Sequence, residues 1–244
     1  MSDPTIAHQT DRVTVWHGNA ADVFANIATE SVDLVITDPP YGQEWVSGRR
    51  KDAFDPLHGD GADAEARDAI RNVLAQCVRA VGQNRHLYIF GPSDVLEGLK
   101  VSEAVEMIWD KGTLGAGDLT ATWGPAHEPI TFCVSKHRHG GKRGTSTVPT
   151  RLRKGTVLRH TRPTGRKVRH PSEKPVGLIR ELVESSSRVD ELVLDPYAGS
   201  GSTAVAALTA GRRAVVVESD TQYIPLIVDR CIAAEAIGRR ALTC

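Results

Sequence analysis

The stretch ELVLDPYAGSGSTAVAAL, residues 191–208, joins a short apolar strand to a glycine-rich turn and then to a helix. Residues 191–194 are predicted as the strand, and residues 202–210 as a helix that ends at Gly211. Gly199 and Gly201 let the backbone turn tightly and approach a ligand closely. The free amides at the start of the helix then face that ligand. A strand, a tight turn and a helix in this order are typical of an α/β sheet.

The same alternation extends along the rest of the chain. We predict further strands at 12–17, 32–37, 86–90, 105–109, 129–134 and 214–217, and further helices at 20–27, 62–81, 175–187 and 221–236. The near-continuous apolar run Val32 to Thr37 is typical of a strand that is buried on both faces. The pattern predicts an α/β doubly wound sheet, in which ligands bind beyond the carboxyl ends of the strands.

Composition narrows the class of protein. The chain has 244 residues and 40% hydrophobic content, enough for one sizeable core in one or two domains. It has no apolar run of membrane-spanning length, and the polar start from Met1 to Thr10 does not resemble a signal peptide. The four cysteines form no CxxC pair, so we expect no zinc site, no disulfide framework and a cytoplasmic setting.

The charges are unevenly distributed. The net charge is zero, but residues 136–170 contain twelve Lys or Arg and no Asp or Glu. The remainder is therefore acidic. Such asymmetry predicts a face that binds a polyanion; a solvated basic loop without a partner is the alternative.

The glycine-rich turn follows one acid and is followed by another. Asp195 ends its strand, and Glu218 ends the next strand. The letters GSGSTA also fit a dinucleotide-binding turn, and a plain structural turn is a further possibility. However, Asp195 would repel the pyrophosphate of a dinucleotide, whereas it would favour the ammonium and sulfonium groups of S-adenosylmethionine. Glu218 can accept both hydroxyls of a ribose. The turn lacks the Gly-Lys-Ser/Thr ending of a P-loop.

A second motif, Asp38-Pro39-Pro40-Tyr41, follows the strand at 32–37. The two prolines restrict the backbone and hold Asp38 and the Pro39 carbonyl in a rigid frame. A carboxylate and a carbonyl can accept the two hydrogens of an exocyclic amine and favour its charge in the transition state. Tyr41 offers a flat face on which a base rotated out of the duplex can stack. An ordinary proline-rich loop is the alternative.

Together these motifs resemble the amino-methyltransferases of DNA, in the group whose catalytic motif precedes the cofactor motif. DPPY (38–41) matches the catalytic motif, and DPYAGSGST (195–203) matches the cofactor motif. HPSEKP (170–175) resembles the family's H-P-x-x-K-P segment, and HEPI (127–130) its H-E-x-I strand. The resemblance covers about residues 13–236. Gly18-Asn19 departs from it, since the family often has Gly-Asp there.

The resemblance implies a Rossmann-like fold with a mostly parallel, seven-stranded sheet. It implies a catalytic half at 1–135, a target-recognition region at 136–170 and a cofactor-binding half of the same domain at 171–244. It places Lys174 near the methionine carboxylate. The expected catalytic residues are Asp38, Pro39, Pro40 and Tyr41, and the expected cofactor-binding residues are His170, Lys174, Asp195, Pro196, Tyr197, Ala198, Gly199, Ser200, Gly201, Ser202, Thr203 and Glu218.

The expected activity is S-adenosylmethionine-dependent methylation of the N6 amino group of adenine in duplex DNA. Asp38 in DPPY favours adenine within the family, and N4 methylation of cytosine is the alternative. An RNA or protein substrate and an inactive DNA-binding relative remain further alternatives. Double-stranded DNA is the expected partner, with Arg49, Arg50 and Lys51 as a second basic contact. The resemblance also allows a homodimer.

Overall fold

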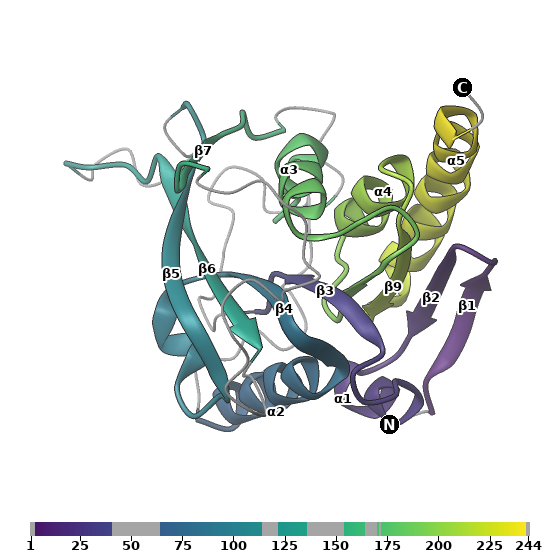
Figure 1. The fold of residues 1–244 in the computed structure, drawn as a ribbon, viewed down its shortest axis with the longest axis horizontal. Coiled ribbons are helices and arrows are strands. Elements are labelled where there is room, and N and C mark those ends of the chain that lie inside the picture. The colour runs from purple at the N-terminus through teal and green to yellow at the C-terminus, as the bar shows by residue number, and fades with distance from the viewer. Residues whose placement is uncertain are drawn as a thin grey trace.

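The computed structural model describes residues 3–40, 64–113, 122–135, 154–163, 170 and 172–242 (Figure 1). Within them a single nine-stranded sheet has the order β1-β2-β9-β8-β3-β4-β6-β5-β7. The strands are β1 (Thr5–Gln9), β2 (Val13–His17), β3 (Val32–Thr37), β4 (Val81–Phe90), β5 (Val101–Asp110), β6 (His127–Ser135), β7 (Val157–Arg159), β8 (Leu192–Asp195) and β9 (Arg213–Glu218).

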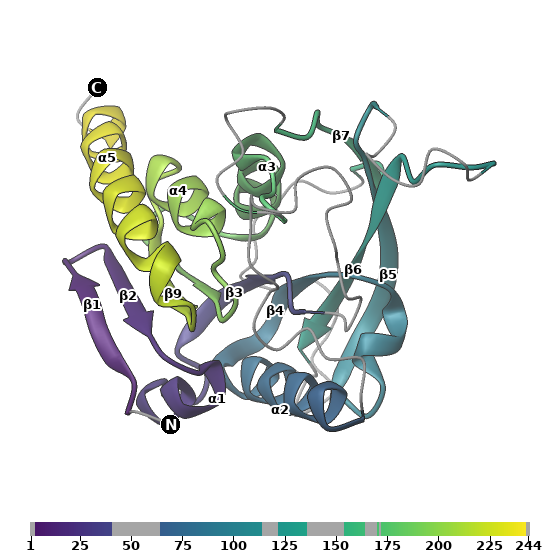
Figure 2. The same ribbon diagram turned by 180° about the vertical axis from the view of Figure 1, so that it is seen from behind.

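Helices cover both faces of the sheet, as predicted for a doubly wound fold. The helices are α1 (Ala20–Val23), α2 (Ala64–Ala80), α3 (Val176–Ser186), α4 (Ser202–Thr209) and α5 (Ile224–Leu242). In Figures 1 and 2, α3, α4 and α5 lie on one face and α1 and α2 on the other. Each face has its own buried cluster, which includes Leu182 and Ile227 on the first face and Val23 and Leu74 on the second. Short 3-10 turns follow α1 and precede α5.

The predicted mostly parallel sheet is confirmed, but the count of seven strands is wrong. Five of the eight strand pairings are parallel; β1–β2, β4–β6 and β5–β6 are antiparallel. The two additional strands, β1 and β7, lie at the two edges. β1 is polar and largely exposed, and β7 has only three residues inside the basic stretch. Neither has the apolar pattern by which a buried strand is predicted.

The predicted elements lie where expected, with shifted ends. β3 has the predicted bounds, whereas β4 and β5 begin several residues earlier than predicted. The last helix continues beyond residue 236. β7 pairs with β5, so the end of the predicted recognition region belongs to the sheet. No helix of the described residues has both the length and the apolar character that spanning a membrane requires.

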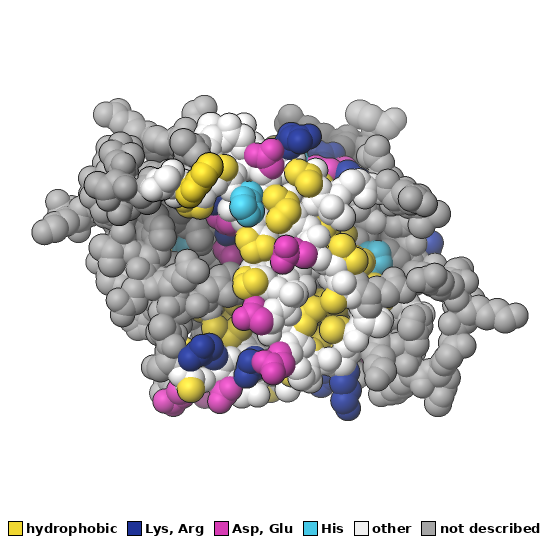
Figure 3. Space-filling model, turned by 90° about the vertical axis from the view of Figure 1, so that its left-hand side faces the viewer, with side chains coloured by type: hydrophobic (Ala, Val, Ile, Leu, Met, Phe, Trp, Pro, Cys, Tyr) yellow, Lys and Arg dark blue, Asp and Glu magenta, His cyan; other side chains and the backbone are white. Residues whose placement is uncertain are grey.

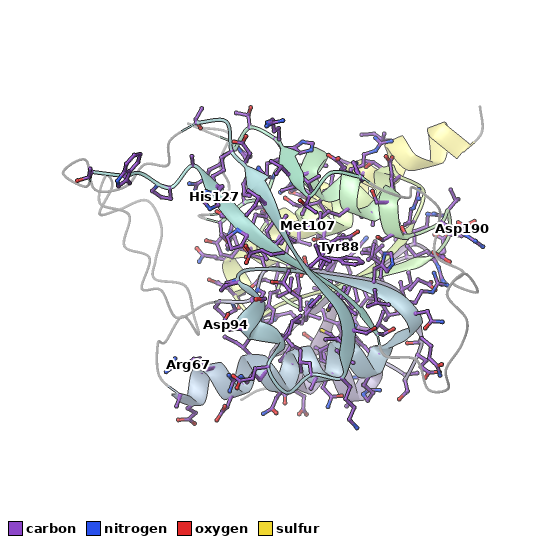
Figure 4. All side chains as sticks on the ribbon, turned by 60° about the vertical axis from the view of Figure 1, so that its left-hand side comes forward. Arg67, Tyr88, Asp94, Met107, His127 and Asp190 are labelled. Carbon is purple, nitrogen blue, oxygen red and sulfur yellow. The ribbon has the colours of Figure 1, made fainter. Side chains whose placement is uncertain are left out.

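The carboxyl ends of the parallel strands meet at one edge of the sheet. β6 runs antiparallel to β4 and β5, so its first residues lie at this same edge, opposite the last residues of β5. Figure 4 shows His127 at this end of β6. The edge therefore brings together residues from six strands: β2, β9, β8, β3, β6 and β5.

Candidate active site

Asp38 and Asp195 lie close together at this edge. β3 and β8 are neighbouring parallel strands with Val35 opposite Leu194, so Asp195 ends β8 just before Asp38 follows β3. The two carboxyl groups interact, because the charge of Asp38 raises the pKa of Asp195. The structure thus brings the two sequence motifs into one site.

Asp195 is almost completely buried, with 4% of its surface exposed. Burial raises the pKa of Asp195 to about 7, although hydrogen bonds from the Thr203 side chain and the Tyr197 amide act in the opposite direction. The Tyr197 amide donates to Oδ1 at 3.0 Å. A cation next to Asp195 would favour its ionised form, so the site suits a positively charged ligand.

Glu218 holds the glycine-rich turn. Its Oε2 atom accepts the Gly199 amide at 2.7 Å, and its Oε1 atom accepts the Asp220 amide at 2.8 Å. Gly199 has a φ of 52°, in the left-handed region that favours glycine. The expected ribose-binding acid therefore also fixes the backbone of the turn.

His170 packs against the same turn from the other side. A Cβ atom added to Gly199 would lie 3.2 Å from Cε1 of His170. The ring contacts Tyr223 edge-on, with centroids 4.4 Å apart. Burial, helped by the charge of Lys174, lowers the pKa of His170 to about 4. We conclude that His170 is neutral at pH 7 and acts here as a packing residue.

Arg230 makes a second link between the two cofactor segments. Its Nη1 atom pairs with Glu173 at 2.9 Å and donates to the carbonyl oxygen of Ser200 at 2.8 Å. Both Arg230 and Glu173 are largely buried. Helix α5 thereby fastens the segment before α3 to the turn before α4.

Lys174 lies between two carboxylates. Its Nζ atom is 2.6 Å from Oδ2 of Asp38 and 3.2 Å from Oε2 of Glu128. Oε1 of Glu128 also pairs with Nζ of Lys111 at 2.6 Å. Four alternating charges therefore run from the end of β5 to the end of β3. The Lys174 ammonium also lies over the Phe90 ring, 4.9 Å from its centroid.

The pKa values of this cluster follow from burial and from charge pairing. Burial raises the pKa of Asp38, and Lys174 only partly offsets the effect. Burial opposes the ionisation of Glu128 and Lys174 too, but their oppositely charged partners outweigh it. The pKa of Glu128 is therefore lowered and that of Lys174 raised. Lys174 stays a cation at pH 7.

The other predicted site residues have different surroundings. Pro196, Ala198, Ser200, Gly201, Ser202 and Thr203 are buried in or beside the turn. The Tyr197 side chain packs with the cluster on the α1–α2 face. Pro39 is buried and Pro40 half-buried. Asn19 caps α1, because its side chain accepts the Ala21 amide at 2.9 Å.

Several predicted residues lie outside the described part of the chain. They are Tyr41, the cluster Arg49, Arg50 and Lys51, and most of the stretch 136–170. Their expected roles stay predictions. Of the basic stretch, residues 154–163 and 170 are described.

Sequence reasoning assigned no role to Lys111 or Glu128. Lys111 directly follows the strand that ends at Asp110, and Glu128 is an acid near the start of an otherwise apolar strand. Both are signals of a kind that marked Asp38 and Asp195. Their pairing depends on the register of β5 and β6, with Trp109 opposite Glu128, which the sequence alone does not show.

The donor set fits S-adenosylmethionine better than a dinucleotide. Asp38, Asp195 and Glu218 place three acidic side chains at one edge of the sheet, next to a tight turn. Such an edge disfavours a pyrophosphate and favours an ammonium or sulfonium group. The chemistry of these residues agrees with the cofactor expected from the motifs.

Comparison with known proteins agrees with this geometry. A family model described as DNA methylase matches residues 32–229, and the chain belongs to this family of N6-adenine and N4-cytosine DNA methyltransferases. The predicted class of enzyme is thereby confirmed. This family uses S-adenosylmethionine as its methyl donor.

Three similar proteins illustrate the family. DNA adenine methyltransferase YhdJ of Escherichia coli K12 is 25% identical, over 87% of this chain and 80% of its own. The DNA modification methylase TTHA0409 of Thermus thermophilus has a similar structure, with a TM-score of 0.65, 24% identity and coverage of 92% and 96%. The cytosine-N4-specific PvuII DNA methyltransferase has a TM-score of 0.67 at 14% identity, with coverage of 98% and 95%.

Proposed function

We propose that this chain methylates the exocyclic N6 amino group of adenine in a short duplex DNA sequence, after the base has rotated out of the helix. The proximity of Asp38 to Asp195 is the observation that supports it most directly. An acceptor for an amine and a site for a cationic methyl donor lie at the tips of neighbouring strands. Family membership supports DNA as the substrate.

The chain's own residues hold both ligands. Asp195, Glu218 and the turn at 199–201 would hold S-adenosylmethionine, which supplies an electrophilic methyl group when bound. Asp38 and the Pro39 carbonyl accept the two amine hydrogens and orient the nitrogen. The negative charge of Asp38 stabilises the positive charge that develops on that nitrogen. Tyr41 stacks on the rotated base and offsets part of an unstacking cost of a few kcal/mol. No covalent enzyme intermediate is needed.

N4 methylation of cytosine is the second candidate, because the fold is also similar to the cytosine-N4-specific PvuII enzyme. Mass spectrometry of nucleosides from methylated DNA separates the two. The proposal expects 6-methyladenine. A 4-methylcytosine peak without 6-methyladenine would reject adenine as the target.

Asp38→Ala tests the catalytic assignment. The variant should lose methyl transfer, while cofactor and DNA binding stay largely intact, because the wider fold does not depend on this carboxylate at the edge of the sheet. Binding is measured by calorimetry and by fluorescence anisotropy. Near-normal turnover in this variant would contradict the role of Asp38.

Residues 136–170 are proposed to contact the DNA. Their twelve basic side chains would neutralise phosphates, so the affinity for duplex DNA should fall steeply as salt rises. A salt-independent affinity would remove this stretch as the contact surface. Competition between duplex DNA and RNA in the methylation assay tests the choice of nucleic acid. A homodimer stays a prediction.

A further inference from the structure

Lys174 creates an electrostatic problem for the reaction proposed above. Its ammonium lies 2.6 Å from the carboxylate that is proposed to stabilise a developing positive charge. Both side chains are largely buried, with 10% and 21% of their surfaces exposed, so solvent screens the pair only weakly. Asp38 and Lys174 taken alone are neutral, and would offer a nascent cation little stabilisation.

Glu128 supplies the missing negative charge. It shares Lys174 with Asp38, so the three nearest groups together have a net charge of minus one. Lys111 balances this charge from the far side of Glu128, next to the Trp109 ring and away from Asp38. Each lysine is thus paired, as buried ammonium groups require.

The backbone fixes Glu128 in this place. It lies on β6 opposite Trp109 of β5, two residues before Ile130, which is opposite Phe90 of β4. Lys174 bridges from β6 to the end of β3 across the Phe90 ring. One carboxylate oxygen of Glu128 serves each lysine, so no shorter or uncharged side chain at this position preserves both pairings.

We propose that Glu128 is a positioning residue for methyl transfer: it divides Lys174 between two carboxylates and thereby preserves the negative charge that Asp38 presents to the amine. This inference rests on the proposed function. Glu128 acts through Lys174, and the other charged groups that face Asp38 are Lys111 and Asp195.

Glu128→Gln tests the proposal in a single-turnover assay at saturating DNA and cofactor. The rate constant of methyl transfer should fall roughly tenfold to hundredfold, as for other small losses of active-site organisation, with little change in KM for DNA. Glu184→Gln is the matched control, since Glu184 forms an exposed ion pair with Arg180 on α3. The control should keep the wild-type rate. A Glu128→Gln rate within about twofold of wild type would overturn the proposal.

The second readout does not need turnover. Glu128 raises the pKa of Asp38 by charge repulsion, and Lys111 lowers it. Carbon-13 NMR titration of the Asp38 carboxyl group should therefore show a lower pKa in Glu128→Gln and a higher pKa in Lys111→Gln. The double variant should lie between them and recover part of the lost rate. A purely structural role would leave the Asp38 titration unmoved, and that result would overturn the proposal.

The two readouts separate this inference from the proposed function. A wild-type protein that transfers no methyl group to DNA contradicts the proposed function, and the Asp38 titration still decides the role of Glu128. A wild-type enzyme that methylates DNA no faster than Glu128→Gln contradicts only the inference. Lys111→Gln keeps the test available if Glu128→Gln does not fold.

Discussion

The Oε2 atom of Glu218 accepts the backbone amide of Gly199 at 2.7 Å, so the end of β9 fixes the turn that follows β8. The other oxygen, Oε1, accepts the Asp220 amide. Both oxygens of one carboxylate thus organise backbone at the place where a cofactor ribose is expected. The same side chain can accept ribose hydroxyls with its remaining lone pairs.

Glu218→Gln should destabilise the protein and weaken cofactor binding. Glutamine has one acceptor oxygen in place of two, so one of the two amides loses its partner at a cost of about 1–3 kcal/mol. Differential scanning calorimetry should show a Tm lower by several degrees, and a smaller rise in Tm on adding S-adenosylmethionine. Glu97→Gln, which breaks an exposed pair with Arg71, is the control. Equal behaviour of the two variants would contradict this role.

Asp195 should make stability depend on pH. Its pKa is raised in the folded protein, so the stabilisation from its protonated form is complete below its unfolded pKa and is lost as pH rises towards about 7. Asp195→Asn removes this dependence and keeps an acceptor for the Tyr197 amide. The Tm of the variant relative to wild type should therefore rise between pH 5 and pH 8. A constant Tm difference would show that Asp195 is not protonated at low pH.

Cofactor binding should depend on the same proton. A cationic ligand favours the ionised form of Asp195, so protonation competes with binding. Isothermal titration calorimetry should give a weaker affinity for S-adenosylmethionine at pH 6 than at pH 8. Asp195→Asn should bind weakly at both pH values. If the wild-type affinity is flat across this range, the ligand does not pair with Asp195.

Lys174→Gln should shift the reaction in the direction opposite to Glu128→Gln. Lys174 lowers the pKa of Asp38, so its loss leaves two neighbouring carboxylates and raises that pKa further. The acidic limb of the single-turnover pH profile should move to higher pH. Cofactor affinity should fall by roughly tenfold or more if Lys174 also binds the methionine carboxylate. An unmoved acidic limb would contradict the pairing with Asp38.

The sequence predicted the architecture and the two motifs of the site because both are local signals. Apolar runs indicate the buried strands, and Asp38 and Asp195 each directly follow such a run. Parallel neighbours then bring these two residues to one edge. β1 and β7 could not be predicted in this way, since their residues are mostly exposed and their pairing depends on strands that precede or follow them.

The charge cluster could not be predicted because it depends on register between distant segments. Lys111, Glu128 and Lys174 come from three separate parts of the chain, and only the β5–β6 and β4–β6 pairings bring them to Asp38. The resemblance placed Lys174 beside the methionine carboxylate, and the structure pairs it with Asp38 and Glu128. The dual structural role of Glu218 has the same origin.

The two edge strands limit how another copy of the chain could attach. In the described part of the chain, β1 is short, polar and irregular between Ile6 and His8, and β7 offers only three residues. Short or bulged borders discourage a foreign strand from extending a sheet. Figure 3 shows hydrophobic and acidic side chains mixed on the β5 side, where Val105 is exposed. Any assembly must therefore form through side-chain surfaces, and disrupting it should leave the hydrogen-bonded ladder of each subunit untouched.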